Sequence, residues 1–330
     1  MKKINLLKDI YYLKEYVSLY LSDKSSLFEF EYKEGKNVFY NISVKTPIEK
    51  IGSQRIFDGY FDLQTAHGYG GYFSNSENSE FLQKAFDNYI SRCNTEGIIS
   101  EFLRFHPYNN FPVIHTNYLD FNLSDRQTVS IKLNQPKEIR WSNYSSTTRN
   151  ILRKIDGNLT FSLSNNIEEF SHLYEKTMER NHAEKFYYFS DEYFKKLKEI
   201  DSMKIFQVSV KGKTASMALV LIGPELAHYH LAASDSEFSQ FNPNHYLIDS
   251  ICDYINKKFS NVSYLHLGGG RTNLADDSLL AFKSKFSQTR NDFVIGGKIF
   301  DIKTYDKYIA AISEEYLGES DLFLKYRLEF

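Results

Sequence analysis

Residues 263–288 read SYLHLGGGRTNLADDSLLAFKSKFSQ and hold the only run of three glycines in the chain. The apolar residues before the glycines predict a strand, and the pattern after them predicts a helix over residues 278–286. A nucleotide-phosphate loop needs glycines at set offsets, usually with a Lys-Ser or Lys-Thr pair opening the next helix. Here Arg271 follows Gly270 instead. We therefore expect the three glycines to end a central strand rather than to bind a nucleotide phosphate.

The residues before this segment predict a meander of antiparallel strands. Its members are short apolar or alternating runs separated by turn residues, namely KIFQVSV, TASMALVLI and LAHYHLAAS. Helices are expected over residues 167–181, ahead of the meander, and over 246–259, after it. Near the end of the chain, DFVI and KIFDI flank Gly296-Gly297, which predicts a late hairpin with its turn at the two glycines.

A helix followed by a buried strand is expected once in each half of the chain. The first pair is a helix over residues 81–93 and the strand IISEFLRFH; the second is the helix over 246–259 and the strand VSYLHLG. We predict an α+β fold with two related domains, each a mixed, mostly antiparallel sheet flanked by helices. The Pro- and Ser/Thr-containing stretch 133–148 suggests an N-terminal domain over 1–145 and a C-terminal domain over 146–330, with the last strand able to pack back on the first domain.

The composition is that of a globular protein. The chain has 330 residues, 42% of them hydrophobic and 25% charged, and a formal net charge of −2. This charge argues against a protein that coats nucleic acid, so we expect no DNA partner, while a local basic patch is compatible with it. The 25 tyrosines and 27 phenylalanines suit strand-rich cores as well as ligand grooves, so they assign no function by themselves.

The cysteines and the N-terminal residues predict a cytoplasmic location. Cys93 and Cys252 lie in apolar helical patterns without Cys or His neighbours at metal-ligand spacing, so we expect neither a disulfide framework nor a metal site there. The N-terminal MKKINLLKDIYYLKEY lacks the uninterrupted apolar core of a signal peptide. Charged residues interrupt every stretch long enough to span a bilayer, so we predict no integral membrane association.

Two charged segments are candidate binding sites. SSTTRNILRKI predicts a helix in which a hydroxyl-rich cap precedes Arg149 and Arg153, four residues apart. Like charges at this spacing repel unless an anion lies between them, so a phosphate site and a solvated basic face explain the pattern about equally well. EFLRFHP places Glu101 and Arg104 on opposite faces of a strand, where each needs a partner. A structural ion pair with another residue is the more common outcome.

Two segments with histidines or aromatic rings supply further candidates. His228 and His230 share a strand face in HYHLAAS; no carboxylate or cysteine set completes a metal site, but one histidine as a proton acceptor stays open. KTMERNHAEKFYYFS ends a helix with Arg180 and then groups Tyr187 and Tyr188 with two phenylalanines. This group is either the lip of a groove or an edge that packs against another domain.

The last two candidates are a tyrosine and a lysine. Tyr69 lies among glycines in HGYGGYF, where the glycines either let a ligand approach the backbone or form tight turns. Lys283 lies beside the apolar face formed by Phe282 and Phe286. It either reaches inward or extends to solvent, and the surface position is the default for a lysine.

Taken in order, these segments resemble the acyltransferase superfamily that includes the GNAT enzymes and the Fem-type aminoacyltransferases of peptidoglycan bridge synthesis. They are HGYGGYF, EGIISEFLRFHP, TTRNILRKI, KTMERNHAEKFYYFS, AHYHLAAS, LHLGGG and DDSLLAFKSKF. The resemblance implies two GNAT-like domains. It also implies transfer of an acyl or aminoacyl group from a thioester or a tRNA ester to an amine.

The resemblance also implies roles for individual residues. Lys283 matches a lysine that stabilises negative charge at the reacting carbonyl, and Arg149 and Arg153 match a basic region that contacts anionic groups. Gly269 would leave room for a substrate backbone, and His230 or Glu101 would accept the proton of the attacking amine. The other expected substrate contacts are Tyr69, Arg104, Arg180, Tyr187, Tyr188 and His228.

We therefore predict an N-acyltransferase with acyl-coenzyme A as the expected donor and an amine of a cell-surface glycan or amino-sugar precursor as the acceptor. The amine would attack directly, because no Ser-His-Asp or Cys-His arrangement is evident. One feature departs from the family: QFNPNHY stands where coenzyme A-binding GNAT enzymes usually carry a glycine-rich loop. The alternatives are a Fem-type enzyme that uses aminoacyl-tRNA and a peptidoglycan precursor, or a non-catalytic sugar-nucleotide-binding protein on the same fold.

Overall fold

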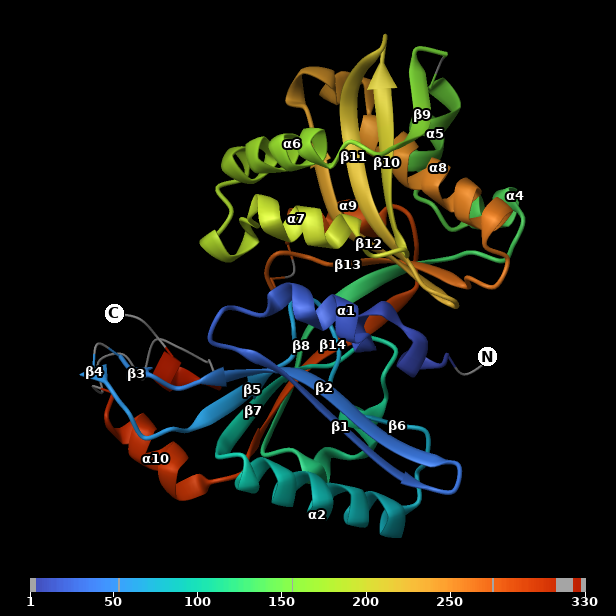
Figure 1. Cartoon of the computed structure of the whole chain (residues 1–330). Coiled ribbons are helices and arrows are strands. Elements are labelled where there is room, and N and C mark those ends of the chain that lie inside the picture. The colour runs from blue at the N-terminus through green and yellow to red at the C-terminus, as the bar shows by residue number, and fades with distance from the viewer. Residues whose placement is uncertain (1–3, 53, 156, 275, 313–322, 328–330) are drawn as a thin grey trace. The chain divides into compact units, whose positions relative to one another are not determined.

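The computed structural model describes residues 4–52, 54–155, 157–274, 276–312 and 323–327 (Figure 1). Its contacts group the chain into two compact units, the first made of residues 1–10 and 126–291 and the second of residues 11–125 and 292–330. This grouping differs from the division expected at residues 145 and 146. Arg140 and Tyr144, which the sequence places in the N-terminal domain, are buried in the first unit because they bond Asp249 there.

The sheet of the first unit has the strand order β8-β13-β12-β11-β10-β9. All neighbouring strands pair antiparallel except β12 and β13. The predicted meander of three antiparallel strands is therefore confirmed as β10, β11 and β12. The strands are β8 (Phe121–Lys132, from Arg126 onward), β9 (Leu159–Ser164), β10 (Met203–Val210), β11 (Lys213–Ile222), β12 (Leu226–Ser234) and β13 (Tyr264–Gly269).

Helices cover both faces of this sheet (Figure 1). On one face α8 (Pro243–Lys258) buries Leu247, Ile251 and Ile255 against the sheet. On the other face, the hydroxyl of Thr177 in α6 bonds the backbone of Ser234 in β12. The remaining helices of the unit are η1 (Leu6–Lys8), α4 (Lys137–Ser142), α5 (Ser146–Lys154), α6 (Ile167–Arg180), η5 (Lys185–Tyr187), α7 (Asp191–Lys198), η6 (Ser236–Phe241) and α9 (Ser278–Ser284).

The two parallel strands of the first unit separate part-way along their length. β12 and β13 are paired over three residues, and the last pair joins His228 and His266. Beyond that point β12 stays paired with β11, and β13 with β8. Parallel neighbours need a crossover connection, which α8 provides. The split strands therefore place the end of β13, with its glycines, away from β12.

The second unit repeats this arrangement. Its sheet runs β1-β2-β5-β7-β14, with β5 and β7 parallel and joined through α2 (Ser79–Thr95). The expected succession of helix and buried strand is thus confirmed twice, as α2 with β7 and as α8 with β13. The strands are β1 (Ser26–Glu34), β2 (Asn37–Pro47), β5 (Phe61–Gln64), β6 (Phe73–Ser74), β7 (Ile98–Arg104), β14 (Arg290–Ile299, from Asp292 onward) and the separate pair β3 (Lys50–Ile51) and β4 (Gln54–Arg55).

Two cores hold the second unit together. On one face α2 contributes Phe81, Phe86 and Tyr89 to an aromatic cluster. On the other, Tyr308 of α10 (Ile302–Ala310) packs with Tyr326 of η7 (Lys325–Arg327). The short helices of the unit are η2 (Ile10–Tyr12), α1 (Lys14–Val17), η3 (Ser18–Tyr20), α3 (Phe111–Ile114) and η4 (Thr116–Tyr118). The predicted α+β class, with mostly antiparallel sheets flanked by helices, is confirmed.

The expected hairpin at Gly296-Gly297 is wrong. β14 runs through both glycines without a turn, and Gly297 pairs with Phe102 of β7. A Cβ atom on Gly297 would lie 2.6 Å from the ring of Phe323, and one on Gly296 would lie 2.9 Å from the ring of Phe105. The glycines therefore make room for aromatic rings on both sides of a continuous strand.

The structure bears on two of the expectations about location. Cys93 and Cys252 are both buried thiols that form no disulfide. Among the described residues, no helix combines the length and apolar composition that crossing a bilayer requires.

Candidate functional site

The end of β13 and the start of α9 form the candidate site of the first unit. The ammonium of Lys283 donates a hydrogen bond to the carbonyl oxygen of Gly269, with 2.7 Å between the two atoms. The side chain thus turns inward, against the surface position that is the default for a lysine. Burial lowers the pKa of Lys283 to about 8, although the charge of Asp277 acts in the opposite direction. Lys283 is therefore a cation at neutral pH that gives up its proton far more readily than an exposed lysine.

Asp277 fixes the loop between β13 and α9. One carboxylate oxygen accepts the backbone N–H of Leu280 and caps α9. The other accepts the N–H groups of Arg271 and Thr272, at 2.9 and 3.0 Å. Burial alone would raise the pKa of Asp277, but these donors outweigh it and lower the pKa. A Cβ atom on Gly270 would lie 2.4 Å from the Asp277 carboxylate, so only glycine fits there.

Gly269 is the last residue of β13, which confirms that the glycines end a strand. A Cβ atom on Gly269 would lie 2.9 Å from the carbonyl oxygen of Gln127 on the neighbouring strand. Gly268 has a φ of +76°, a conformation that side-chain-bearing residues rarely adopt. The backbone that receives the Lys283 hydrogen bond is therefore held in a close, glycine-dependent turn.

The two histidines of β12 have different partners. Tyr229 pairs with Val220 and Leu231 with Leu219, so His230 is the extra residue of a β-bulge. Its Nε2 atom lies 2.9 Å from the hydroxyl of Tyr193 in α7. The bulge therefore gives His230 surroundings that differ from those of His228.

His228 belongs to a buried chain of polar side chains. Its Nε2 atom lies 2.8 Å from a carboxylate oxygen of Asp9, and its Nδ1 atom lies 3.4 Å from Nδ1 of His266. The three residues are at most 4% exposed. His228 and His266 are the last pair before β12 and β13 separate. This buried group of polar side chains therefore begins where the two strands separate.

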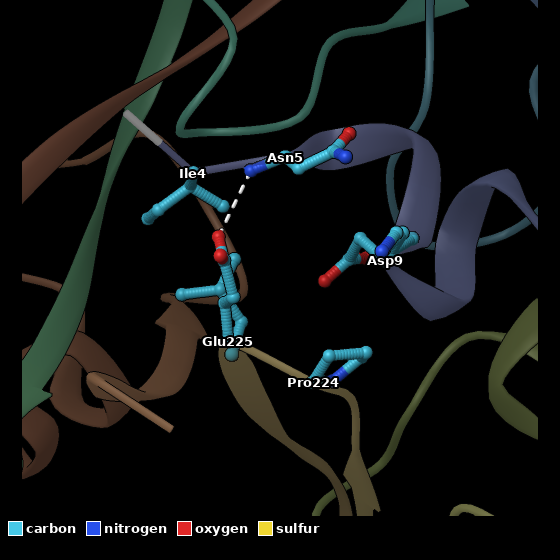
Figure 2. Close-up of a pocket in the computed structure, with 7 residues that line it drawn as sticks. Ile4, Asn5, Asp9, Pro224 and Glu225 are labelled. Atoms are coloured by element: carbon cyan, nitrogen blue, oxygen red, sulfur yellow. Dashed lines mark hydrogen bonds between the residues drawn. The ribbon is translucent and has the colours of Figure 1, made fainter. Parts of the chain in front are cut away.

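Asp9 also borders a small hollow in the first unit. Figure 2 shows its side chain pointing into the hollow, with Glu225 and Pro224 across from it. The backbone N–H of Asn5 donates to the carboxylate of Glu225 at 2.9 Å. The hollow is open to solvent and is lined by Ile4, Asn5, Lys8, Asp9, Pro224, Glu225 and Leu226. Asp9 thus connects the buried histidines to a solvent-facing hollow.

Among the described residues, the two arginines of α5 bond no partner in common. Arg149 donates to the carbonyl oxygens of Tyr144 and, at 3.4 Å, of Trp141, so it covers carbonyl groups at the end of α4. Arg153 is exposed and bonds Asn150 at 3.2 Å. Arg180 bonds the carbonyl of Ser234 at 2.9 Å and so ties α6 to the end of β12. A role of these three residues in substrate binding stays a prediction.

The aromatic segment after α6 lies next to the β13–α9 loop. The guanidinium of Arg271 donates to the carbonyl oxygen of Asn181 at 3.3 Å. Burial raises the pKa of Tyr187, and the charges of Arg126 and Arg271 act against that rise, which places both arginines in its neighbourhood. Tyr188 is 42% exposed. Tyr187 is thus near the candidate site, and a role of Tyr188 in substrate binding stays a prediction.

Sequence reasoning missed Arg126 and Arg271 as members of this site. Arg126 donates to the carbonyl oxygens of Gly270 and Arg271, at 3.3 and 2.8 Å. Arg271 follows the three glycines directly, and this position is the sequence feature that could have identified it as part of the site. Arg126 lies more than a hundred residues earlier in a polar strand segment, where nothing local distinguishes it.

Glu101 lies in the core of the second unit. Its side chain is completely buried and accepts four hydrogen bonds. The donors are the side chains of Asn41, Ser43, Tyr72 and Tyr89, at 2.6 to 2.8 Å. Burial raises the pKa of Glu101, and the four donors act in the opposite direction. Both carboxylate oxygens are therefore occupied by donors of the core, and a role of Glu101 as proton acceptor stays a prediction.

Tyr69 and Arg104 also belong to the second unit. The ring of Tyr69 meets those of Tyr11 and Phe293 edge to face, with centroids 5.2 and 5.4 Å apart. Gly68 and Gly71 have φ angles of +99° and +82°, and a Cβ atom on them would lie 2.5 Å from the ring of Tyr11 and 2.6 Å from the ring of Phe105. The glycines around Tyr69 therefore make room for aromatic rings. As alternation along the strand predicts, Arg104 does not pair with Glu101.

The loop before α8 does not resemble a cradle for a pyrophosphate. Residues 236–241 form the 3₁₀ helix η6, and the N–H of Glu237 bonds the side chain of Asp235 at 2.9 Å. The N–H of Asn242 bonds the carbonyl of Ser239, and Pro243 has no N–H group. Converging N–H groups are what a phosphate loop supplies, and two acidic side chains repel a pyrophosphate. The ordinary coenzyme A contact of GNAT enzymes therefore does not fit this loop.

Comparison with known proteins identifies the domain that carries the candidate site. Residues 156–283, all within the first unit, match the model of the acetyltransferase (GNAT) domain family. A search by sequence among proteins with curated descriptions found no match. The family match supports an acyltransferase.

Several solved structures share the fold. FemX has a TM-score of 0.73 at 13% identity, covering 93% of this chain and 95% of its own. L-PGS from Bacillus licheniformis has a TM-score of 0.53 at 9% identity, covering 86% and 87%. A C-terminal DUF2156 domain from Agrobacterium fabrum has a TM-score of 0.52 at 12% identity, covering 82% and 83%. The expected resemblance to GNAT and Fem-type proteins is confirmed, and at these identities the structural likeness concerns the fold.

Proposed function

We propose, from the GNAT-type acetyltransferase domain at residues 156–283, that this acyltransferase moves an acyl group to an amine at the site formed by Lys283 and the end of β13. The observation that carries the proposal is the inward position of Lys283. Its ammonium bonds the carbonyl of Gly269, a position with no room for a side chain, beyond His266, the last residue of β13 that pairs with β12. A partly desolvated cation at such a place suits a reaction in which negative charge develops.

The chemistry follows from direct attack by the amine. The amine nitrogen forms a bond to the acyl carbonyl carbon, and the carbonyl oxygen takes up negative charge, which Lys283 would stabilise. The bond from the carbonyl carbon to the donor's oxygen or sulfur then breaks, and the leaving group keeps the electron pair. Removing one such stabilising group typically lowers turnover by about 100- to 1000-fold.

The amine must also lose a proton. We propose His230 as the acceptor, because its bulge position and its contact with Tyr193 fix the imidazole in the same unit as Lys283. A lysine whose pKa is about 8 is in turn able to protonate the leaving group. The proton would thus pass from the amine to His230, while the leaving group takes one from Lys283 or from water.

The donor and the acceptor complete the proposal. Acyl-coenzyme A is our first candidate donor because the domain is of the GNAT type, and an amine of a cell-surface glycan or amino-sugar precursor is the acceptor. The loop before α8 favours a second candidate, since Asp235 and Pro243 leave no ordinary pyrophosphate cradle. That candidate is a Fem-type enzyme that takes an aminoacyl group from tRNA and passes it to a peptidoglycan precursor. The third candidate function is the binding of a sugar nucleotide without catalysis.

Thermal unfolding with added ligands distinguishes these candidates. A ligand at 100 times its dissociation constant stabilises the folded chain by about 2.7 kcal/mol. A rise in Tm with acetyl-coenzyme A or longer thioesters identifies a coenzyme A donor. A rise with UDP-linked amino sugars alone calls for a transfer assay with aminoacyl-tRNA, with and without ribonuclease. If Lys283→Ala transfers acyl groups as fast as the wild-type chain, the assignment of Lys283 is wrong.

A further inference from the structure

The second unit holds a cation for which its described residues supply no anion. Arg104 ends β7, and its guanidinium donates one hydrogen bond, to the carbonyl oxygen of Thr65 at 2.9 Å. Within the described parts of the chain, no carboxylate lies at ion-pair distance from it, whereas Arg92 and Arg327 pair with Glu96 and Asp62. A guanidinium carries five N–H donors, so most of the donors of Arg104 are available to bind a ligand.

The neighbours of Arg104 are neutral. Its guanidinium lies over the ring of Phe102, 4.8 Å from the centroid. Burial lowers the pKa of Arg104 to about 10. Burial and then the charge of Arg104 lower the pKa of His67 to about 4, so His67 is uncharged at neutral pH. A cation that has lost part of its hydration without gaining a counter-ion costs free energy, and proteins usually retain such a residue for function.

The backbone holds Arg104 firmly. Its N–H bonds the hydroxyl of Thr65 at 3.1 Å, and its carbonyl oxygen accepts the N–H of Gly70 at 2.8 Å. Ile295 of β14 pairs with it on the other side. His67 is held as well, because the hydroxyl of Tyr16 donates to its carbonyl oxygen at 2.8 Å. The backbones that carry Arg104 and His67 are therefore fixed before any ligand arrives.

We propose that Arg104 binds an oxyanion of a ligand, a carboxylate or a phosphate group, with Thr65 and neutral His67 beside it. The planar fork of an arginine matches both groups through two parallel N–H bonds. This anion site lies entirely within the second unit. It does not depend on acyl transfer at Lys283, so either proposal can fail without the other.

Nuclear magnetic resonance of the full chain tests the site directly. Sodium acetate and sodium phosphate are titrated separately at constant ionic strength while the backbone amides of Arg104 and His67 are followed. We expect saturable shifts of both amides in the wild-type chain, and their loss in Arg104→Met. Saturation with acetate alone identifies a carboxylate, and saturation with phosphate alone identifies a phosphate ester. Arg92→Met serves as the matched control, because Arg92 is exposed, lies in the same unit and already has Glu96 as its partner.

A second readout separates ligand binding from a structural role. An arginine kept for a ligand costs stability in its absence, so Tm of Arg104→Met should equal or exceed that of the wild-type chain. Should this variant fail to fold, Arg104→Lys keeps the charge without the fork and is expected to weaken anion binding about tenfold. The proposal is overturned if the shifts do not saturate, if Arg104→Met shows the same shifts as the wild-type chain, or if Arg104→Lys binds both anions unchanged.

Discussion

We expect Lys283→Met to be at least as stable as the wild-type chain at pH 7. The pKa of Lys283 falls from 10.5 to about 8 in the folded chain. At about 1.36 kcal/mol per pKa unit, holding the ammonium in this partly buried position costs up to roughly 3 kcal/mol. Methionine removes that cost but leaves the carbonyl of Gly269 without its donor, which costs about 1 to 3 kcal/mol. The net change in the free energy of unfolding is then about zero to 2 kcal/mol in favour of the variant.

The pH dependence has a definite sign. The folded pKa lies below the unfolded one, so above about pH 8 the unfolded chain binds one proton more at this group than the folded chain. The stability of the wild-type chain therefore rises, relative to the variant, as pH increases from about 8 to about 10.5. Over that interval any advantage of Lys283→Met should disappear.

Urea unfolding at pH 7, 8.5 and 10 measures this difference. Trp141 is the only tryptophan and lies in the same unit as Lys283, so its fluorescence reports the relevant part of the chain. Lys285→Met is the control, because Lys285 is exposed and two residues away. A variant that loses more than about 2 kcal/mol at pH 7, by an amount that stays constant with pH, would refute the reasoning.

Three further changes test other parts of the structure. Glu101→Leu leaves four buried donors without an acceptor and should cost about 3 to 5 kcal/mol in urea unfolding; a loss below about 1 kcal/mol would contradict the described network. Gly269→Ala places a Cβ atom 2.9 Å from the carbonyl of Gln127, so Tm should fall by several degrees, corresponding to about 1 to 3 kcal/mol, and an unchanged Tm would show that the strand end is not tight. Asp9→Asn removes the charged acceptor of His228 and should cost about 1.5 to 3 kcal/mol in thermal unfolding, whereas a stable variant with unaltered imidazole ¹⁵N shifts would exclude the contact.

Local sequence patterns predicted the meander and the two helix–strand pairs because each depends on neighbouring residues. The helix expected over residues 81–93 is α2, and the strands of the meander are β10, β11 and β12. The same local reasoning failed at Gly296-Gly297. Two adjacent glycines are compatible with a turn and with close packing, and the rings of Phe105 and Phe323, both distant in sequence, decide between the two.

For the candidate site, too, the sequence predicted some features and only the structure showed the others. Lys283, Asp277 and the three glycines lie within sixteen residues of one another, so the sequence could group them around one strand end and one helix start. It could not say whether Lys283 points inward, because both orientations suit its helical position. The carbonyl of Gly269 and the surrounding burial decide this, and they exist only when β13 lies against α9.

The sequence by itself thus determined the meander, the two helix–strand pairs, the family resemblance and the segment that contains the site. Only the tertiary structure decided which residues come together. Asp9 contacts His228, and Arg126 contacts the glycine loop. Arg104 has no carboxylate at ion-pair distance among the described residues, although acidic residues are common throughout the sequence. Hydrophobic periodicity reports which face of an element is buried, but polar contacts depend on distances between elements far apart in sequence. Those distances are set by the packing of the sheets and helices.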